Sequence, residues 1–211
     1  MENIFLRIQE LRAMKPNETI TLTGTEVQEL LDNLIATNPL TFLPGNATIE
    51  SMLNKMLLSG KKFALLYPDF DNFKPFNDVY GFLNGDKVIK MGAEVIQKAA
   101  KDCFVGHIGG DDFVVITSIE CAEEIAKEII REFNKRILEF YPEEAQRDGF
   151  FEAKDRRGNV CKFPLTSISI GIVTNEKREF CSITEIAFVA AEVKKVAKSI
   201  PEKYFIDRRT N

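Results

Sequence analysis

The sequence predicts an α+β domain in which helices pack on a mostly antiparallel sheet. Two hairpin patterns support this fold class, at residues 103–118 and 150–163, because each joins two β-rich runs through a turn of glycine and charged residues. The other strand and helix patterns are mixed along the chain, without the regular alternation of a doubly wound parallel sheet. With 211 residues, the chain is long enough to bury a core without disulfide or metal support.

The first part of the domain opens with a loop at 38–46 that contains proline, glycine and asparagine. Apolar residues then recur at helical spacing, which predicts a helix that starts near 46–48 and ends at Gly60. A short apolar run at 63–67 predicts a buried strand. Two further helices are expected after that strand, at 73–80 and 86–101.

The second part of the domain is predicted to contain both hairpins, two helices and two more strands. A long amphipathic pattern predicts the first helix, and alternation of apolar and small residues predicts a core strand after the second hairpin. In chain order, the expected elements are strands 103–108 and 113–118, a helix 122–141, strands 150–153, 160–163 and 165–173, a helix 182–198 and a strand 203–207.

The N-terminal segment, residues 1–38, is expected to be an appendage to a main domain at 39–211. Apolar residues recur at helical spacing over 2–13 and again over 25–34. Helices of this kind often join an upstream sensory or regulatory domain to the domain that follows. A solvated N-terminal arm is the alternative interpretation.

Composition narrows the function classes. A formal charge of −4 argues against a dedicated nucleic-acid binder, which is usually basic. The four cysteines are scattered without a CxxC pair, and His107 is the single histidine, so a zinc site is not expected. No apolar run is long enough for a membrane span, and the N-terminus lacks a signal-peptide pattern. We therefore predict a cytoplasmic location without membrane insertion.

Carboxylates occur where two predicted strands end. Asp69 and Asp71 follow the apolar run at 63–67, and Asp111 and Asp112 lie in the first hairpin turn. If those strands are neighbours, the carboxylates converge, and a divalent cation would relieve their repulsion. Oxygen ligands of this kind select Mg²⁺ or Mn²⁺, which usually keep positions for substrate phosphates. An ordinary hairpin turn is the alternative, because glycine and aspartate favour turns.

Several linked motifs occur in an order that is typical of one protein family. They are Asp69-Phe-Asp-Asn-Phe-Lys-Pro-Phe-Asn-Asp-Val-Tyr-Gly81 with Gly85-Asp86, then Gly109-Gly-Asp-Asp-Phe113, with flanking segments at 38–46 and 166–171. Together they resemble the GGDEF family of diguanylate cyclases over about residues 39–211. The resemblance implies a central, mostly antiparallel sheet flanked by helices, similar to nucleotidyl cyclases and polymerase palm domains. It also implies condensation of two GTP molecules into cyclic di-GMP.

The resemblance implies a metal site and a catalytic group. Asp69, Asp111 and Asp112 would ligate Mg²⁺ or Mn²⁺ with their carboxylates, and Phe70 would contribute its backbone carbonyl. Asp111, Asp112 and Lys74 would take part in catalysis. Either Asp111 or the metal would help to deprotonate the attacking 3′-hydroxyl, and the sequence does not separate these two possibilities.

The resemblance also implies a substrate site. Asn77 and Asp86 would hydrogen-bond the guanine edge, whose N1–H and N2–H donors adenine lacks. The triphosphate would contact Lys74, Lys195, the backbone of Phe73 and Phe76, and Gly109 and Gly110. Two such domains would face each other, each with one GTP, so a homodimer is expected for catalysis.

The sequence departs from the family pattern at several positions. Asp112 replaces the usual glutamate, Pro68 precedes Asp69, and His107 stands where many members have arginine. The final Gly-Arg-Asn element is replaced by residues 199–201, for which Arg208 and Arg209 are candidate substitutes. A product-inhibition RxxD motif is absent at 100–103. These departures leave open a weak or inactive domain that binds GTP and regulates an attached domain or partner. A different nucleotidyl cyclase or polymerase-like palm domain, with the same metal chemistry and another product, is a further alternative, against which the guanine-selective Asp86 argues.

Overall fold

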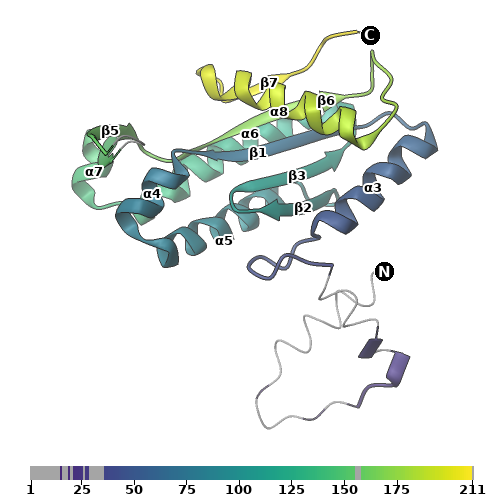
Figure 1. Ribbon diagram of the computed structural model, residues 1–211, viewed down its shortest axis with the longest axis horizontal. Helices are drawn as coiled ribbons and strands as arrows, with labels where there is room; N and C mark the ends of the chain where they lie inside the picture. Colours follow the sequence, from purple (N-terminus) through teal and green to yellow (C-terminus); the bar gives the residue numbers. More distant parts are fainter. Residues whose placement is uncertain are drawn as a thin grey trace.

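Five strands form one sheet in the order β2-β3-β1-β6-β7 (Figure 1). The pairs β1–β3, β1–β6 and β2–β3 are antiparallel, and the edge pair β6–β7 is parallel. The α+β fold class with a mostly antiparallel sheet is therefore confirmed. The strands are β1 (Ala64–Asp71), β2 (Phe104–Gly109), β3 (Asp112–Thr117), β6 (Ser167–Thr174) and β7 (Tyr204–Ile206). The structure is a computed structural model that describes residues 15, 19, 21–25, 27–28, 36–154 and 158–210.

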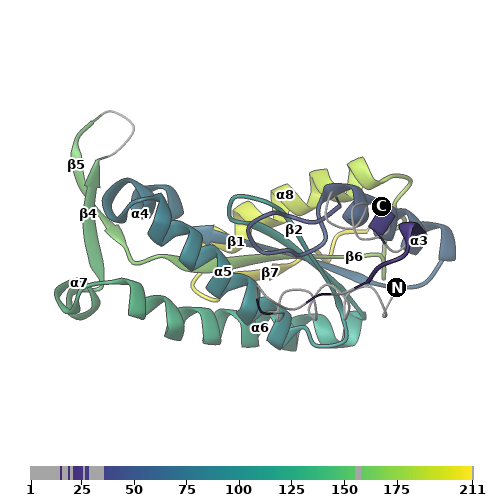
Figure 2. The same cartoon turned by 90° about the horizontal axis from the view of Figure 1, so that it is seen from below.

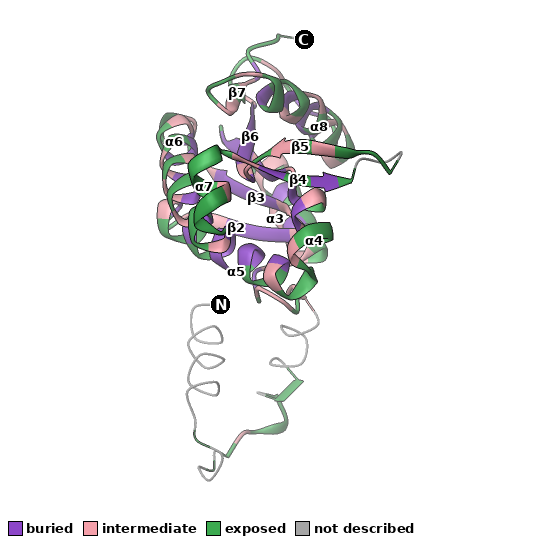
Figure 3. Cartoon of the chain, turned by 90° about the vertical axis from the view of Figure 1, so that its left-hand side faces the viewer, coloured by how far each residue is buried: buried purple, intermediate pink, exposed green. Residues whose placement is uncertain are grey.

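Helices cover both faces of the sheet. One face packs against α3 (Asn46–Ser59) and α8 (Ile183–Ser199), and the other against α5 (Phe82–Ala99) and α6 (Ile119–Arg136). Figure 2 shows α8 and α6 on opposite sides of the strands. Each face has its own apolar cluster, so the central strands are buried on both sides (Figure 3). The ends of these strands are thus held by a well-packed core.

Side chains alternate between the two clusters along β1, and this alternation sets the direction of the acidic residues. Leu65 and Tyr67 join the cluster under α3 and α8, whereas Leu66 and Phe70 join the cluster under α5 and α6. Asp69 comes two residues after Tyr67, so its side chain belongs to the α8 face of the sheet. The acidic end of β1 therefore lies beneath α8.

Strand β1 extends beyond the predicted apolar run and passes through Pro68 to Asp71. Pairing with β6 is continuous, with Pro68 opposite Ile170. Pairing with β3 covers residues 64–66 and resumes at Asp69, which leaves a gap beside the proline. Because proline has no N–H to donate, it interrupts one ladder next to the acidic residues without ending the strand.

The second predicted hairpin is confirmed as a separate two-stranded sheet that projects beyond α4 (Figure 2). The rings of Tyr80, Tyr141 and Phe151 pack together, with centroid distances from 5.3 to 5.8 Å. The side-chain amide of Asn72 donates to the Pro164 carbonyl at 3.2 Å. These contacts fix the hairpin to the helix that follows β1. The elements concerned are α4 (Phe73–Tyr80), β4 (Phe150–Lys154) and β5 (Val160–Pro164).

Two predicted helices have different bounds in the structure. Helix α5 begins at Phe82 rather than at 86, directly after Gly81, whose φ of 84° ends α4. The helix predicted over 122–141 is divided, because α6 ends at Arg136 and Pro142 precedes a new helix. The division consists of a 3-10 turn, η1 (Ile137–Phe140), and α7 (Glu143–Asp148).

The N-terminal helical patterns at 2–13 and 25–34 lie almost entirely outside the described residues. The proposed boundary between residues 38 and 39 therefore stays a prediction. Among the described residues, no helix combines the length and the apolar character that a bilayer span requires. The cytoplasmic location also stays a prediction.

Candidate active site

The end of β1 and the turn between β2 and β3 bring Asp69 and Asp112 together, with Asp111 next to Asp112 in the chain. Asp69 lies opposite Asp112 in the β1–β3 register, so the two strands are neighbours as the convergence of these groups requires. Asp111 precedes Asp112 in the same turn, and burial together with the negative charges of Asp69 and Asp112 raises its pKa. Asp69 is buried, whereas Asp111 and Asp112 are half-buried.

Two lysines of α8 reach this carboxylate group. The Lys194 ammonium lies 2.7 Å from Asp69 Oδ2 and 2.9 Å from Asp112 Oδ1, so it bridges the two strands. The Lys198 ammonium contacts the other oxygen of Asp69 and lies 3.9 Å from Asp71 Oδ1. These lysines are four positions apart, which places both on the same side of the helix.

The position of α8 is set by a close approach to β6. A Cβ at Gly171 would lie 2.8 Å from the backbone nitrogen of Lys194 and 3.2 Å from the carbonyl carbon of Val193. Only a residue without a side chain leaves room for the helix backbone there. Val193 is buried against the sheet, and Lys194 follows it at the edge of that buried face. The packing of α8 therefore fixes where the Lys194 side chain starts.

Asp71 has a separate set of partners on the neighbouring strand. Its Oδ2 accepts hydrogen bonds from Ser167 Oγ at 2.8 Å and from Ser169 Oγ at 2.7 Å. The Lys203 ammonium lies 3.1 Å from the same oxygen. Asp71 is thus engaged by β6 and by the loop before β7, and it holds a third lysine beside Lys198.

The charges in this cluster shift the carboxyl groups in opposite directions. Burial and the nearby Asp69 and Asp112 raise the pKa of Asp111 to about 6. Burial, with the repulsion of Asp69, also raises the pKa of Asp112, although Lys194 opposes this. Burial acts to raise the pKa of Asp69 as well, but Lys194 and Lys198 outweigh it and hold that pKa below its ordinary value. An added cation would stabilise the two carboxylates whose pKa is raised.

The chemistry of the cluster fits a hard divalent cation. The candidate metal ligands among the side chains of the cluster are carboxylate oxygens. Those of Asp69 and Asp112 already converge on one positive group, the Lys194 ammonium. Within the described ranges, no three acidic, histidine or cysteine side chains are grouped closely enough to form a ready-made metal site. A cation would therefore have to displace Lys194 before it could contact both carboxylates.

The glycine turn is held by the histidine that replaces the expected arginine. Gly110 has a φ of 58°, which favours glycine, and its carbonyl lies 2.9 Å from His107 Nε2. His107 Nδ1 lies 2.8 Å from the Thr41 hydroxyl, and the ring stacks on Phe113 with centroids 4.2 Å apart. Burial lowers the pKa of His107 below its ordinary value, which favours the neutral ring. His107 supports the turn rather than presenting a charge to solvent.

The residues expected to bind guanine lie at the junction of α4 and α5. Asn77 Oδ1 is buried and has no hydrogen-bond partner among the described residues. A Cβ at Gly85 would lie only 1.9 Å from that oxygen, so the glycine makes room for the Asn77 amide. Asp86 follows Gly85 and is exposed. A buried acceptor without a partner is uncommon and suits a ligand that donates.

The start of α4 offers backbone donors, but not at every expected position. The N–H of Phe76 donates to the Asn72 carbonyl at 3.1 Å, so it is already used within the helix. The expectation that Phe76 contacts phosphate through its backbone is therefore not supported. Phe73 and Lys74 lie in the first turn, where helix N–H groups lack intrahelical acceptors. The side chain of Lys74 is exposed.

Lys195, the lysine expected to contact the triphosphate, does not reach the cluster. It lies on the exposed side of α8, and no described contact joins it to the carboxylates. Each helix residue turns by about 100°, so Lys194 and Lys198 point toward the sheet end while Lys195 points away. Lys194, Lys198 and Lys203 were not among the residues predicted from the sequence. Lys194 and Lys198 each directly follow a buried residue of α8, Val193 and Ala197, so the apolar periodicity of the helix would have identified these two lysines.

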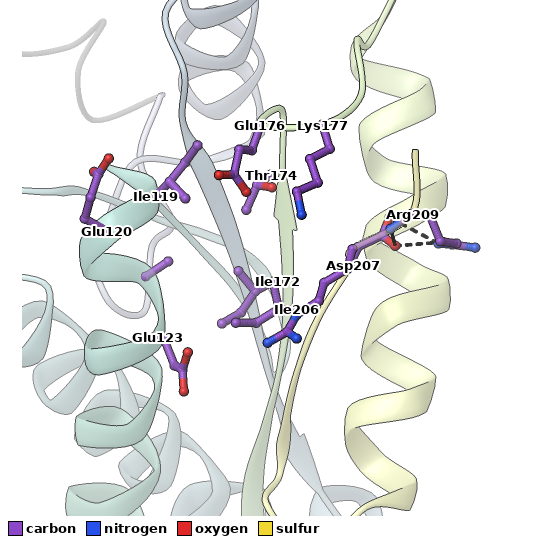
Figure 4. A pocket seen from close by; sticks show the side chains of 12 residues that line it. Ile119, Glu120, Glu123, Ile172, Thr174, Glu176, Lys177, Ile206, Asp207 and Arg209 are labelled. Carbon is purple, nitrogen blue, oxygen red and sulfur yellow. Dashed lines mark hydrogen bonds and ion pairs between the residues drawn. The ribbon is translucent and has the colours of Figure 1, made fainter. Parts of the chain in front are cut away.

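The two C-terminal arginines lie elsewhere. Arg209 pairs with Asp207 at 2.7 Å and with Glu192 at 3.0 Å. Arg208 lines a pocket of about 290 Å³. Figure 4 shows this pocket beside Thr174, which lies at the opposite end of β6 from Ser167. Neither arginine therefore substitutes for the missing phosphate-binding arginine.

The fold and this site define a class of protein: an α+β domain with carboxylates and lysines gathered at one end of a mostly antiparallel sheet. The family model described as "Diguanylate cyclase, GGDEF domain" matches residues 35–150, more than half of the chain. The chain therefore belongs to the GGDEF family.

Two curated relatives and one solved structure illustrate the likeness. The chain is 34% identical to the diguanylate cyclase DgcP of Pseudomonas aeruginosa over 44% of this chain and 15% of DgcP. It is 30% identical to the cyclic di-GMP phosphodiesterase PdeR of Escherichia coli over 51% of this chain and 18% of PdeR. It thus matches less than a fifth of either relative. The isolated GGDEF domain of TpbB (YfiN) from Pseudomonas aeruginosa aligns with a TM-score of 0.61 and 23% identity, over 81% of this chain and 93% of that chain.

Proposed function

We propose that the domain is a diguanylate cyclase that condenses two GTP molecules into cyclic di-GMP at the interface of two copies, with Mg²⁺ as cofactor. The observation that carries this proposal is the convergence of Asp69 and Asp112 with Lys194 and Lys198, next to Asp111 in the turn. Carboxylates for a metal and ammonium groups for phosphates are the two components that phosphoryl transfer needs.

In this proposal, each 3′-hydroxyl attacks the α-phosphorus of the GTP bound by the other domain. The bond from that phosphorus to the bridging oxygen breaks, and pyrophosphate leaves. The hydroxyl proton would pass to Asp111, or the cation would lower the pKa of the hydroxyl so that solvent takes the proton up. Burial and its neighbours raise the pKa of Asp111 to about 6, and a bound cation would lower that pKa again, so this value does not choose between the two routes.

The cofactor and the substrate would share the residues of the cluster. Asp69, Asp111, Asp112 and the Phe70 carbonyl would hold Mg²⁺, which neutralises charge on the phosphates. Lys198 and Lys74, with the first-turn amides of α4, would bind the triphosphate. The turn formed by Gly109 and Gly110 would lie against the nucleotide. Asn77 and Asp86 would accept hydrogen bonds from the guanine edge, and the buried Asn77 oxygen supports this role.

The direct test is product formation. Concentrated protein is incubated with GTP and Mg²⁺, and cyclic di-GMP and pyrophosphate are separated by chromatography. We expect both products, with a rate that rises faster than linearly with protein concentration where dimers are scarce. GTP binding without pyrophosphate, even in a variant with forced dimerisation, would refute cyclase activity.

A GTP-binding domain that regulates an attached domain or partner is the second candidate. Two observations favour it: the shorter Asp112 at a proposed ligand position, and Lys194 between the two carboxylates. The likeness to PdeR, which is named as a phosphodiesterase, is consistent with a family domain that serves another activity. In this case GTP would bind with guanine selectivity but would not turn over.

Two lysines of α8 allow a matched test of the triphosphate site. We expect Lys198→Met to weaken GTP binding by about tenfold, because Lys198 contacts Asp69 at the centre of the cluster. Lys195→Met removes the same charge from the exposed side of the helix and should change the affinity by less than about twofold. Calorimetric titration with GTP measures both. Equal losses of GTP affinity, or a larger loss for Lys195→Met, would show that Lys195 belongs to the triphosphate site.

A further inference from the structure

Lys194 occupies the space between the two carboxylates that the proposed function assigns to a divalent cation. Its ammonium lies within 2.9 Å of both Asp69 and Asp112, and these two residues come from different strands. Lys194 lies outside the motifs that carry the family resemblance. A positive group held between two proposed metal ligands must leave before a cation can bind both.

Three features hold Lys194 in this position. Its side chain is only 18% exposed, so solvent competes weakly for the ammonium. The ammonium lies 4.6 Å from the centre of the Tyr67 ring, on the same face of β1 as Asp69. The close approach at Gly171 fixes the backbone of Lys194. The lysine is therefore a built-in part of the site rather than a surface side chain that folds over it.

We infer that Lys194 is an internal counter-ion that competes with the divalent cation for Asp69 and Asp112. This inference rests on the proposed function, because that function supplies the metal. Without nucleotide, the cation must break two charged hydrogen bonds to enter, so its affinity is low. When a nucleoside triphosphate binds, its phosphates offer the released ammonium new anionic partners. Cation and nucleotide therefore bind cooperatively, and the domain binds the cation only weakly when no nucleotide is present.

The test of this inference is the affinity of the whole chain for Mn²⁺ in the absence of nucleotide, measured by electron paramagnetic resonance. We expect Lys194→Met and Lys194→Gln to bind Mn²⁺ about tenfold more tightly than the unmodified protein, since no ammonium opposes entry. Lys194→Arg keeps the charge and should stay near the unmodified value. The matched control is Lys55→Met, which removes one charge from the exposed surface of α3. Its Mn²⁺ affinity should not change.

Cooperativity provides a second measurement. A GTP analogue with a methylene bridge between the α- and β-phosphates should strengthen Mn²⁺ binding strongly in the unmodified protein and much less in Lys194→Met. Unchanged Mn²⁺ affinity in both neutral variants, with circular dichroism showing that either is folded, would overturn the inference even if the unmodified protein makes cyclic di-GMP. Tighter Mn²⁺ binding in the neutral variants would support the inference even if no variant turns over GTP, in which case the cyclase proposal alone fails.

Discussion

Asp69→Asn is expected to lower the rate of cyclic di-GMP formation by at least on the order of 10²-fold. Asp69 is buried, unlike Asp111 and Asp112, and both of its oxygens face ammonium groups. The variant removes the negative charge that would hold the cation and leaves Lys198 without its closest partner. Because charge stabilisation is the main contribution that a protein makes to phosphoryl transfer, the loss falls on kcat. The rate is measured at saturating GTP and Mg²⁺.

The loss of activity must be separated from a loss of structure. Lys194 keeps its contact with Asp112 in this variant, so we expect the fold to persist, which thermal unfolding followed by circular dichroism checks. Asp102→Asn is the matched control: it makes the same change at an exposed turn residue with a φ of 65°, where asparagine is equally well accommodated. An Asp69→Asn protein that is folded and still makes product at the unmodified rate would disprove the metal assignment.

The parts of the fold that the sequence predicted are those whose determinants are local. Gly60 ends α3 with a φ of 64°, and Gly110 turns the first hairpin with a φ of 58°. Apolar periodicity identified the long helices. The ladder β1–β3 meets the condition under which the carboxylates were expected to converge. Glycine turns and periodicity carry this information within a few residues, so no tertiary contact is needed to find them.

The parts that were missed depend on how elements pack together. Which lysine of α8 faces the carboxylates depends on the rotation of the helix, and that rotation is fixed by the contact at Gly171 on another strand. Lys203 reaches Asp71 from a backbone with a φ of 62°, which no local pattern predicts. A family motif places residues in order but does not orient them.

Gly85→Ala is expected to reduce kcat/KM for GTP on the order of 10²-fold while leaving the protein at least as stable. The added Cβ would lie 1.9 Å from Asn77 Oδ1, so the Asn77 side chain must rotate away from its buried position. Folding is not expected to suffer, because the displaced atom is the end of a flexible side chain. In addition, alanine favours a helix interior over glycine by about 1 kcal/mol. Steady-state kinetics and thermal unfolding measure the two effects on the same sample.

A double-mutant cycle with Asn77→Ala decides whether the glycine acts through this amide. If it does, Gly85→Ala costs little further activity once Asn77 is already alanine, because nothing remains to be displaced. Gly92→Ala is a useful contrast in the same helix, since its Cβ would lie 2.4 Å from Phe70 in the core and should destabilise the fold instead. Independent, additive losses from Gly85→Ala and Asn77→Ala would mean that Gly85 serves the nucleotide directly. The buried oxygen of Asn77 would then have no part in the effect.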